Sequence, residues 1–141
     1  TPSEPAVNRW MRVAGRVLLD TNIVIALFAA EPEVLARLQQ QSAVYLSVPV
    51  LGELRYGAMA SSRVEQNLWK LDELAQSVSV LACDVHTADF YARAKAGLRS
   101  KGRPIPENDV WIAAIALQHG LTLATRDNHF EYVNGLSLEL W

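Results

Sequence analysis

The sequence predicts an α/β protein in which a mostly parallel sheet is sandwiched between helices. Short apolar runs of strand length alternate along the chain with longer segments of helical periodicity. Strands separated by helices need crossover connections, which produce parallel pairing and cover both faces of the sheet. The chain has 141 residues, of which 50% are hydrophobic, and this size fits one globular domain. Ligands of such sheets bind at the carboxyl ends of the strands.

The first half of the chain is expected to contain two strands and three helices. The run at 17–19 is short and apolar, which is typical of a buried strand, and it ends at Asp20. Pro49 stands where proline is tolerated, in the first turn of a helix. In order, the expected elements are a strand at 17–19, helices at 23–30 and 33–41, a strand at 43–48 and a helix at 49–60.

The second half alternates in the same way. Apolar residues recur at helical spacing over 64–74, and Ser61 and Ser62 are candidate caps for that helix. Asn108 is the expected cap of a later helix, which Gly120 closes at the usual stop position. The remaining expected elements are a strand at 78–81, a helix at 87–101, a turn at 102–107, a helix ending at 119, and strands at 121–124 and 136–140.

Composition argues against several protein classes. With 13 Lys+Arg and 15 Asp+Glu, the formal charge is −2, which disfavours a wholly basic nucleic-acid module. The longest apolar runs, 23–30 and 110–117, are far shorter than the roughly 20 residues of a membrane-spanning helix. The single cysteine, Cys83, fits a reducing compartment and is expected to be a small buried residue. We therefore expect a cytoplasmic protein with no membrane partner, in which residues 1–16 extend a domain at 17–141.

Four acidic residues occupy positions that are unusual for a solvated surface acid. Asp20 ends the first buried strand, and Asp127 follows the strand expected at 121–124. Asp109 shares a helical face with three apolar residues, so its carboxylate is expected to point toward the protein. Glu53 lies in a helix with glycines nearby, which leave room for a molecule to approach it. Each also has an ordinary alternative role, as a helix cap, a turn residue, a first-turn acid or an exposed helix glutamate.

In a parallel sheet these four acids converge on one edge. Asp20 and Asp127 lie at strand ends, and two helices can bring Glu53 and Asp109 to the same place. Two carboxylates about 4 Å apart repel by roughly 4 kcal/mol at an effective dielectric near 20, so such a cluster needs a proton or a cation. All-oxygen ligation selects Mg²⁺ or Mn²⁺. An ion held this way retains waters and binds phosphates, which is the composition of a phosphodiester-cleaving site.

The segments around these acids resemble the PIN-domain ribonucleases and, among them, the VapC toxins of bacterial VapBC toxin–antitoxin pairs. The resemblance extends from about Val17 to Trp141 and keeps the four acids in order. It rests on the segments Leu18-Leu19-Asp20-Thr21-Asn22, Glu53-Leu54-Arg55-Tyr56-Gly57, Pro106-Glu107-Asn108-Asp109-Val110-Trp111-Ile112-Ala113-Ala114 and Ala124-Thr125-Arg126-Asp127-Asn128-His129-Phe130. The residues before Val17 are the main departure from the family pattern.

The resemblance implies a compact α/β/α sandwich and a divalent-metal-dependent endoribonuclease. It also implies a homodimer that a cognate VapB antitoxin neutralises. The family's acidic quartet matches Asp20, Glu53, Asp109 and Asp127. The expected metal ligands are Asp20, Asp109 and Asp127, directly or through water, with Mg²⁺ as the expected ion and Mn²⁺ as the alternative.

The expected substrate contacts come from polar residues beside the quartet. Thr21 and Asn22 match the small polar residues that follow the first acid of the family pattern, and Thr125 matches the hydroxyl residue near the last acid. The implied reaction is hydrolysis, in which water activated by the metal attacks an RNA phosphate. Glu53 is expected to orient that water or to complete the metal shell.

A run of positive charge precedes the helix that carries Asp109. It has no acid between Phe90 and Pro106, and its members are Arg93, Lys95, Arg99, Lys101 and Arg103. The ordinary interpretation is a solvated helix face, and contact with RNA phosphates is the alternative. The three histidines, His86, His119 and His129, are too scattered in the sequence to form a convincing metal or acid–base group, so structural roles are expected for them.

Other functions remain as alternatives. A PIN fold retained as a binding module without catalysis is one, although the intact quartet argues against it. A phospho-receiver signalling domain is another small α/β protein with a strand-end aspartate and magnesium. It requires a second acid beside the acceptor and a late lysine, whereas Thr21 and Asn22 follow Asp20 and no lysine occurs after Lys101. A nucleotide-binding module is disfavoured because neither standard glycine-rich phosphate loop is present.

Overall fold

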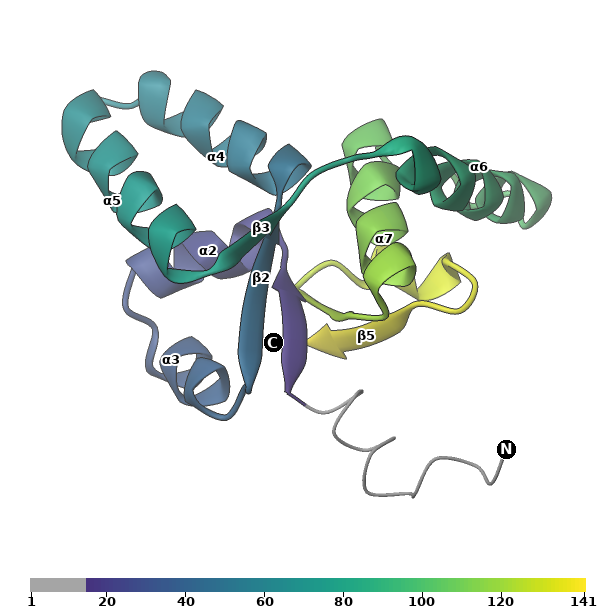
Figure 1. Ribbon diagram of the computed structural model, residues 1–141, viewed down its shortest axis with the longest axis horizontal. Helices are drawn as coiled ribbons and strands as arrows, with labels where there is room; N and C mark the ends of the chain where they lie inside the picture. Colours follow the sequence, from purple (N-terminus) through teal and green to yellow (C-terminus); the bar gives the residue numbers. More distant parts are fainter. Residues whose placement is uncertain (1–14) are drawn as a thin grey trace.

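The sheet has five strands, all parallel, in the order β3-β2-β1-β4-β5 (Figure 1). The computed structural model describes residues 15–141. Residues 1–14, most of the extension expected at 1–16, lie outside the described part of the chain, and Arg16 already belongs to the first strand. The α/β class and the parallel sheet predicted from the alternation of strands and helices are confirmed.

The elements follow one another as predicted, and their ends differ from the expected ones by about one or two residues, as is usual for element boundaries. The strands are β1 (Arg16–Leu19), β2 (Ala43–Ser47), β3 (Ser79–Leu81), β4 (Thr122–Thr125) and β5 (Ser137–Leu140). The helices are α2 (Thr21–Phe28), α3 (Pro32–Gln39), α4 (Val48–Met59), α5 (Val64–Ser77), α6 (Val85–Ser100), α7 (Glu107–His119) and the short 3-10 helix η1 (Asn128–Tyr132). No pattern in the sequence predicts η1.

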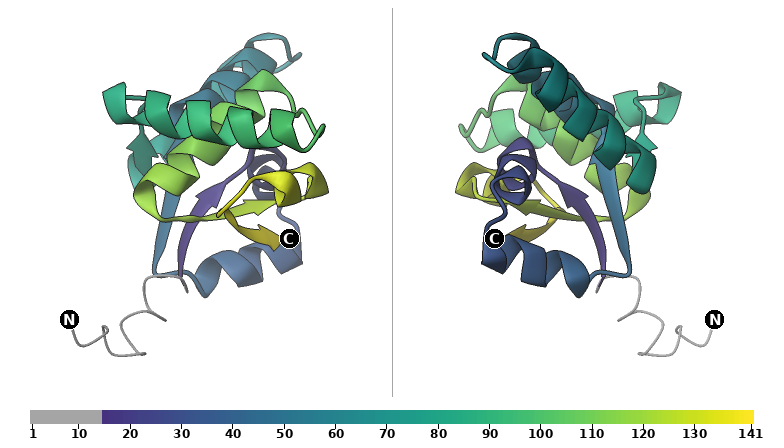
Figure 2. Two further views of the ribbon diagram at one scale, coloured as in Figure 1. Left: turned by 90° about the vertical axis from the view of Figure 1, so that its right-hand side faces the viewer. Right: turned by 90° about the vertical axis from the view of Figure 1, so that its left-hand side faces the viewer.

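Helices cover both faces of the sheet. In Figure 1, α2 and α3 lie on one side of the sheet, and α6 and α7 lie on the other; the two side views of Figure 2 agree. The chain proceeds outward from β1 to β2 and β3, then returns to β4 on the other side of β1. Right-handed crossovers place the helices between β1 and β3 on one face of the sheet and the helices between β3 and β4 on the other. Within residues 15–141, no helix is long and apolar enough to cross a membrane.

The core is densest where β1, β4 and α7 meet. Residues 17–19 of β1 and 123–124 of β4 are completely buried. In α7 the whole of 112–116 is buried, including the apolar residues that share a face with Asp109. The carboxyl ends of the two central strands and the start of α7 are therefore held on a rigid frame.

The predicted cap of α5 is wrong. The helix begins at Val64 with Arg63 at its N-cap, and no side chain caps it. Ser61 lies at the end of the preceding turn instead, where its hydroxyl donates a hydrogen bond to the backbone oxygen of Ala58 at 2.6 Å. Ser62 belongs to the bend between the two helices. A serine in this connection therefore satisfies the C-terminus of α4, whose last carbonyls need donors.

Two further local predictions are wrong. Asn108 does not cap α7, because the helix begins at Glu107 with Pro106 at its N-cap. Asn108 lies in the first turn, where its side chain is available for a contact outside the helix. Cys83 is exposed and not buried. It lies in the connection that leaves β3, an edge strand, for α6.

Candidate active site

Asp20 directly follows β1 at the carboxyl end of the sheet. The parallel register pairs Leu19 with Ala124. Asp20 therefore lies beside Thr125, the last residue of β4. Asp20 is only 4% exposed, and its Oδ1 accepts a hydrogen bond from the backbone N–H of Thr21 at 2.8 Å. The residue is thus the N-cap of α2 and a member of the acidic site at once.

Thr125 connects the acids at the strand ends. Its hydroxyl donates to Asp20 Oδ2 at 2.6 Å. The same oxygen accepts from the backbone N–H of Asp127 at 3.0 Å and from the side-chain amide of Asn22 at 3.5 Å. Because Thr125 is fully buried, it orients Asp20 and the turn that carries Asp127, and its hydroxyl does not face solvent as a substrate contact would. Asn22 is half-buried and belongs to the same network.

Glu53 is exposed on α4, and two side chains from other helices hold its carboxylate. Thr21 Oγ1, from the first turn of α2, donates to Glu53 Oε2 at 3.1 Å. Asn108 Nδ2, from the first turn of α7, donates to Glu53 Oε1. The carboxylate therefore joins three helices at the edge of the sheet where Asp20 lies. This arrangement fixes a side chain that would otherwise be mobile in solvent.

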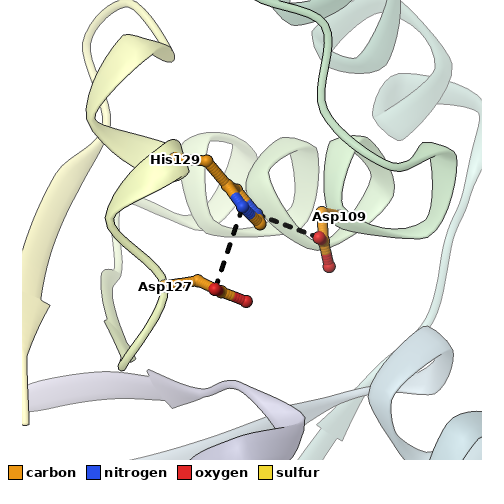
Figure 3. Close-up of side chains that lie close together, drawn as sticks. All are labelled: Asp109, Asp127 and His129. Carbon is orange, nitrogen blue, oxygen red and sulfur yellow. Dashed lines mark hydrogen bonds and ion pairs between the residues drawn. The ribbon is translucent and has the colours of Figure 1, made fainter.

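Asp109, Asp127 and His129 form the other side of the site (Figure 3). His129 projects from η1 between the two carboxylates. Its Nε2 lies 3.0 Å from Asp109 Oδ2, and its Nδ1 lies 3.9 Å from Asp127 Oδ1. Asp109 comes from the start of α7 and Asp127 from the turn after β4. Three elements therefore converge on one point.

Crowding and burial change the pKa values of the two inner carboxyls. Burial raises the pKa of Asp20 above its ordinary 3.8, although the hydrogen bond from Thr125 opposes the rise. Desolvation raises the pKa of Asp109 to about 6, and repulsion by Asp20 adds to it. The charge and hydrogen bond of His129 work in the opposite direction on Asp109. Both shifts mean that ionising every carboxyl costs free energy, which a bound cation would offset.

The donor set fits a divalent cation. Ligand atoms of Asp109, Asp127 and His129 all lie within 4.8 Å of one another. Carboxylates suit Mg²⁺ and Mn²⁺, and an imidazole favours the transition metal of the two. Asp20, the third expected ligand, is outside this closest group, but it lies near enough for its charge to raise the pKa of Asp109.

Sequence reasoning misses two residues of the site, His129 and Asn108. His129 reaches Asp109 because η1 folds back on α7, although the two residues are separated by 20 positions in the chain. Asn108 was interpreted as a cap, and its contact with Glu53 spans 55 positions. The available signal is adjacency: His129 is two residues from Asp127, and Asn108 is next to Asp109. His86 and His119 are not brought to the site by any contact of the described residues.

An apolar hollow of about 320 Å³ opens beside the acids. It lies between α2, α4 and α5, and it shares Thr21 and Glu53 with the acidic site. Ile25 and Phe28 line its apolar wall, and Gly57 lies on its α4 side. Ile25 is 58% exposed, which is unusual for an isoleucine next to a core. The hollow therefore offers apolar surface directly next to the carboxylates.

Comparison with known proteins gives a consistent result across sequence and structure. The PIN domain family matches residues 17–136. "Ribonuclease VapC2" of Haemophilus influenzae is 34% identical over 129 residues, covering 89% of this chain and 98% of that protein. The "tRNA(fMet)-specific endonuclease VapC" of Shigella flexneri is also 34% identical, with the same coverage of 89% and 98%.

Solved structures agree with the sequence relatives. The complex of VapBC2 from Rickettsia felis with a DNA fragment from their promoter contains a chain that superposes with a TM-score of 0.82 and 29% identity, over 89% of this chain and 98% of that one. VapBC-1 from nontypeable Haemophilus influenzae gives a TM-score of 0.81 and 32% identity, over 89% and 97% of the two chains. With the acids of the family pattern gathered at the carboxyl edge of the expected fold, the chain belongs to the PIN-domain family and, within it, to the VapC group.

Proposed function

We propose that this protein is a divalent-metal-dependent endoribonuclease that acts as the toxin of a type II toxin–antitoxin system. The observation that carries the proposal is the convergence of Asp20, Glu53, Asp109 and Asp127, from four separate parts of the chain, on one edge of the sheet. The ribonuclease names of relatives that share about a third of the sequence support the same reaction class. Four carboxylates would not be collected there for stability, because their mutual repulsion opposes folding.

Asp20, Asp109 and Asp127 are the residues that would hold the ion, Mg²⁺ or Mn²⁺, and His129 adds an imidazole to the donor set. When bound, such an ion supplies Lewis-acid chemistry, because it lowers the pKa of water and stabilises negative charge on a phosphate. The partial burial of Asp109 strengthens electrostatic interactions at this point compared with open water.

The other residues of the site position groups around the reacting phosphate. Glu53 is exposed and held at both oxygens, so its carboxylate can orient the attacking water and accept a hydrogen bond from it. Thr21 and Asn108 keep that carboxylate aimed, and Thr125 does the same for Asp20. In the reaction a bond forms between water oxygen and phosphorus while one bridging phosphorus–oxygen bond of the RNA breaks. The attacking water gives a proton to solvent or to a carboxylate of the site, and the oxygen that leaves phosphorus takes up a proton from solvent. The products are a phosphate monoester and a free hydroxyl.

A VapB-type antitoxin is the proposed protein partner, and a homodimer is the proposed assembly. The solved structures that resemble this chain include VapBC complexes from Rickettsia felis and Haemophilus influenzae. The apolar hollow that borders Thr21 and Glu53 supports such a partner, because a bound polypeptide segment would cover apolar surface and obstruct the carboxylates together. Exposed Ile25 would be buried by the same contact.

The test is RNA cleavage by the Asp20→Asn/Asp109→Asn double variant. Both substitutions keep the shape of the side chain and the cap of α2 but remove two charges from the site. We expect cleavage of total RNA in Mg²⁺ or Mn²⁺ to fall by a factor of roughly 100 or more, because loss of a single catalytic electrostatic group costs about that much. Circular dichroism and thermal unfolding check that the variant is folded.

The matched control is Asp72→Asn/Asp89→Asn, which removes two exposed acids that pair with Arg55 and Arg93 and contact none of the four acids of the site. This control should cleave RNA at the rate of the wild type. A folded site variant with full metal-dependent activity would refute the proposed function. A wild type that binds the antitoxin but cleaves no RNA would instead favour a binding module without catalysis.

A further inference from the structure

The positive run that begins in α6 and continues past its end contains two kinds of residue. Arg93 pairs with Asp89 at 2.7 Å, and Lys95 pairs with Glu107 at 2.9 Å. These two charges are neutralised by neighbours on the same surface. The other three cations are exposed and form no ion pair within residues 15–141; they are Arg99, Lys101 and Arg103.

Two of the unpaired cations meet at Tyr132. The Lys101 ammonium donates hydrogen bonds to the backbone oxygen of Tyr132 at 2.9 Å and to Asn134 Oδ1. The Arg103 guanidinium carbon lies 4.6 Å from the centre of the Tyr132 ring, which is cation–π distance. All of these partners are neutral, so both cations keep their full charge. Tyr132 is 36% exposed, so part of the residue is open to solvent.

Tyr132 ties this surface to the acidic site through η1. It is the last residue of that helix, and His129, three residues earlier, contacts Asp109. In a 3-10 helix residues three apart lie on the same side, separated by about 6 Å along the axis. Arg103 approaches the same region from the other direction, because the segment after it leads directly into the start of α7. The unpaired cations and the acids are therefore neighbouring parts of one surface.

The usual structural explanation covers only part of this arrangement. Cations in the last turn of a helix interact favourably with its dipole, which is sufficient for Arg99 and for Lys101 at the C-cap of α6. It does not explain Arg103, which lies beyond the helix and stacks on a ring. Glu131, an exposed acid on η1, forms no ion pair with any of the three cations.

We propose that Arg99, Lys101, Arg103 and Tyr132, here named the cationic flank, bind the RNA strand next to the cleavage point. The inference rests on the proposed ribonuclease function and adds a substrate-binding surface to it. The three cations contact phosphates, and the Tyr132 ring with the Arg103 plane over it accepts an unpaired base by stacking. RNA is favoured over an anionic membrane, because a ring and a guanidinium plane beside the acidic site can stack on a nucleotide base. A lipid headgroup has no base to stack.

The experiment measures binding of a fluorescein-labelled, mixed-sequence, single-stranded 12-nucleotide RNA by anisotropy at several salt concentrations. The reference is the full chain carrying Asp20→Asn/Asp109→Asn, so that the RNA is not cleaved. Into it we introduce Lys101→Gln/Arg103→Gln. The slope of log affinity against log salt is negative. Removing two phosphate contacts should reduce its magnitude by about 1.4, at roughly 0.7 per contact with a single strand.

The matched control is Arg93→Gln/Lys95→Gln, which removes the same net charge from α6, the helix that precedes Lys101 and Arg103, but takes cations that are already paired. It should leave the salt slope near that of the reference. Lys101→Arg/Arg103→Lys keeps both charges but changes both side-chain shapes, so it should return the slope to that of the reference. A merely structural role would not require this. Tyr132→Leu should weaken binding about fivefold or more without changing the slope, because stacking carries no counterion release.

Three results would contradict the proposed role of the cationic flank. Equal slopes for the flank and control variants, both folded by thermal unfolding, would show that the cationic flank is not a phosphate-binding surface, while the ribonuclease function itself would stand if the wild type cleaves RNA. A reference protein that binds no RNA, together with a wild type that cleaves none, would remove the proposed function as well. Binding to vesicles that contain phosphatidylserine, lost with the flank substitutions while RNA binding is unchanged, would assign the surface to a membrane.

Discussion

Thr125 shows how one buried hydroxyl organises the acidic site. It donates to Asp20 and accepts from the backbone of Asp127 and the amide of Asn22. One side chain therefore aligns the residue that follows β1, a residue of α2 and the turn after β4. A hydroxyl can do this because it has one donor and two acceptor positions. Among the described residues no buried polar side-chain atom lacks a partner, which is consistent with this tight network.

The raised pKa of Asp109 predicts that its contribution to the free energy of unfolding depends on pH. Its pKa in the folded protein is about 6, raised from 3.8 chiefly by desolvation, so the native state binds the proton more tightly than the unfolded chain does. Stability contributed by the protonated carboxyl is therefore lost as the pH rises from about 4 through 6. Asp109→Asn removes this loss, and we expect the metal-free variant to be more stable near neutral pH by on the order of 1–2 kcal/mol, a value reduced for solvent screening.

Urea unfolding in EDTA at pH values from about 4 to 8 measures this difference. The gain should be close to zero at the acid end and constant above the folded-state pKa. The surface variant Asp89→Asn, whose residue pairs with exposed Arg93, should change stability by no more than about 0.5 kcal/mol. A variant less stable than the wild type at neutral pH would contradict the assignment of Asp109 as a desolvated, repelled carboxyl.

At the scale of elements, strand ends and helix starts supply the acids and α4 supplies access to them. Glu53 lies on α4 between Gly52 and Gly57, where an added Cβ would meet no atom within 4 Å. Glycine in a helix interior costs roughly 0.5–1 kcal/mol relative to alanine. No packing contact or positive φ in the described residues requires glycine at these positions. The two glycines therefore leave space beside Glu53, and they do so at a cost to the stability of the helix.

We therefore expect Gly57→Ala to raise the free energy of unfolding by about 0.5–1 kcal/mol. Gly120→Ala is the opposing control, because Gly120 ends α7 with a φ of 63°, in the left-handed region. That substitution should lower the free energy of unfolding by about 1 kcal/mol or more. Urea midpoints at unchanged m-values distinguish the two. Destabilisation by Gly57→Ala would mean that α4 needs glycine for a contact within the fold.

At the scale of the whole molecule, charge is unevenly distributed. The 13 basic and 15 acidic residues give a net charge of −2, but four of the acids belong to one site. Outside that site, basic residues outnumber acidic ones by two. Net charge alone is therefore a poor guide to an RNA partner, because it averages the acidic cluster with the cationic residues outside it.

A divalent ion should stabilise the entire fold through this site. If the site holds the ion as proposed, the ion binds the native state in preference to the unfolded chain. Mg²⁺ or Mn²⁺ at about 100 times its Kd should then add about 2.7 kcal/mol to the free energy of unfolding. Differential scanning calorimetry with and without the ion measures the rise in Tm. The Asp20→Asn/Asp109→Asn variant should show no rise, and Asp72→Asn/Asp89→Asn should match the wild type. An equal rise in both variants would place the ion elsewhere.

The comparison of sequence and structure is most informative where they differ. The buried strand 17–19 and the apolar face of α7 were predictable because period and burial are local properties of the chain. Asp20 at a strand end was predictable for the same reason. The caps of α5 and α7 were not, because no side chain caps either helix. The expected cap residues Ser61 and Asn108 bond to Ala58 and Glu53 instead.

The sequence by itself determined the α/β class, the order of the elements and the identity of the four acids, because each follows from apolar periodicity or from a short motif. Only the tertiary structure decided that His129 lies between Asp109 and Asp127, that Asn108 holds Glu53, and which cations of α6 remain unpaired. The physical reason is that the deciding contacts are long-range. Lys95 meets Glu107 across 12 positions, His129 meets Asp109 across 20, and Asn108 meets Glu53 across 55. Their distances are set by how η1, α4 and α7 pack, which no local pattern of residues encodes.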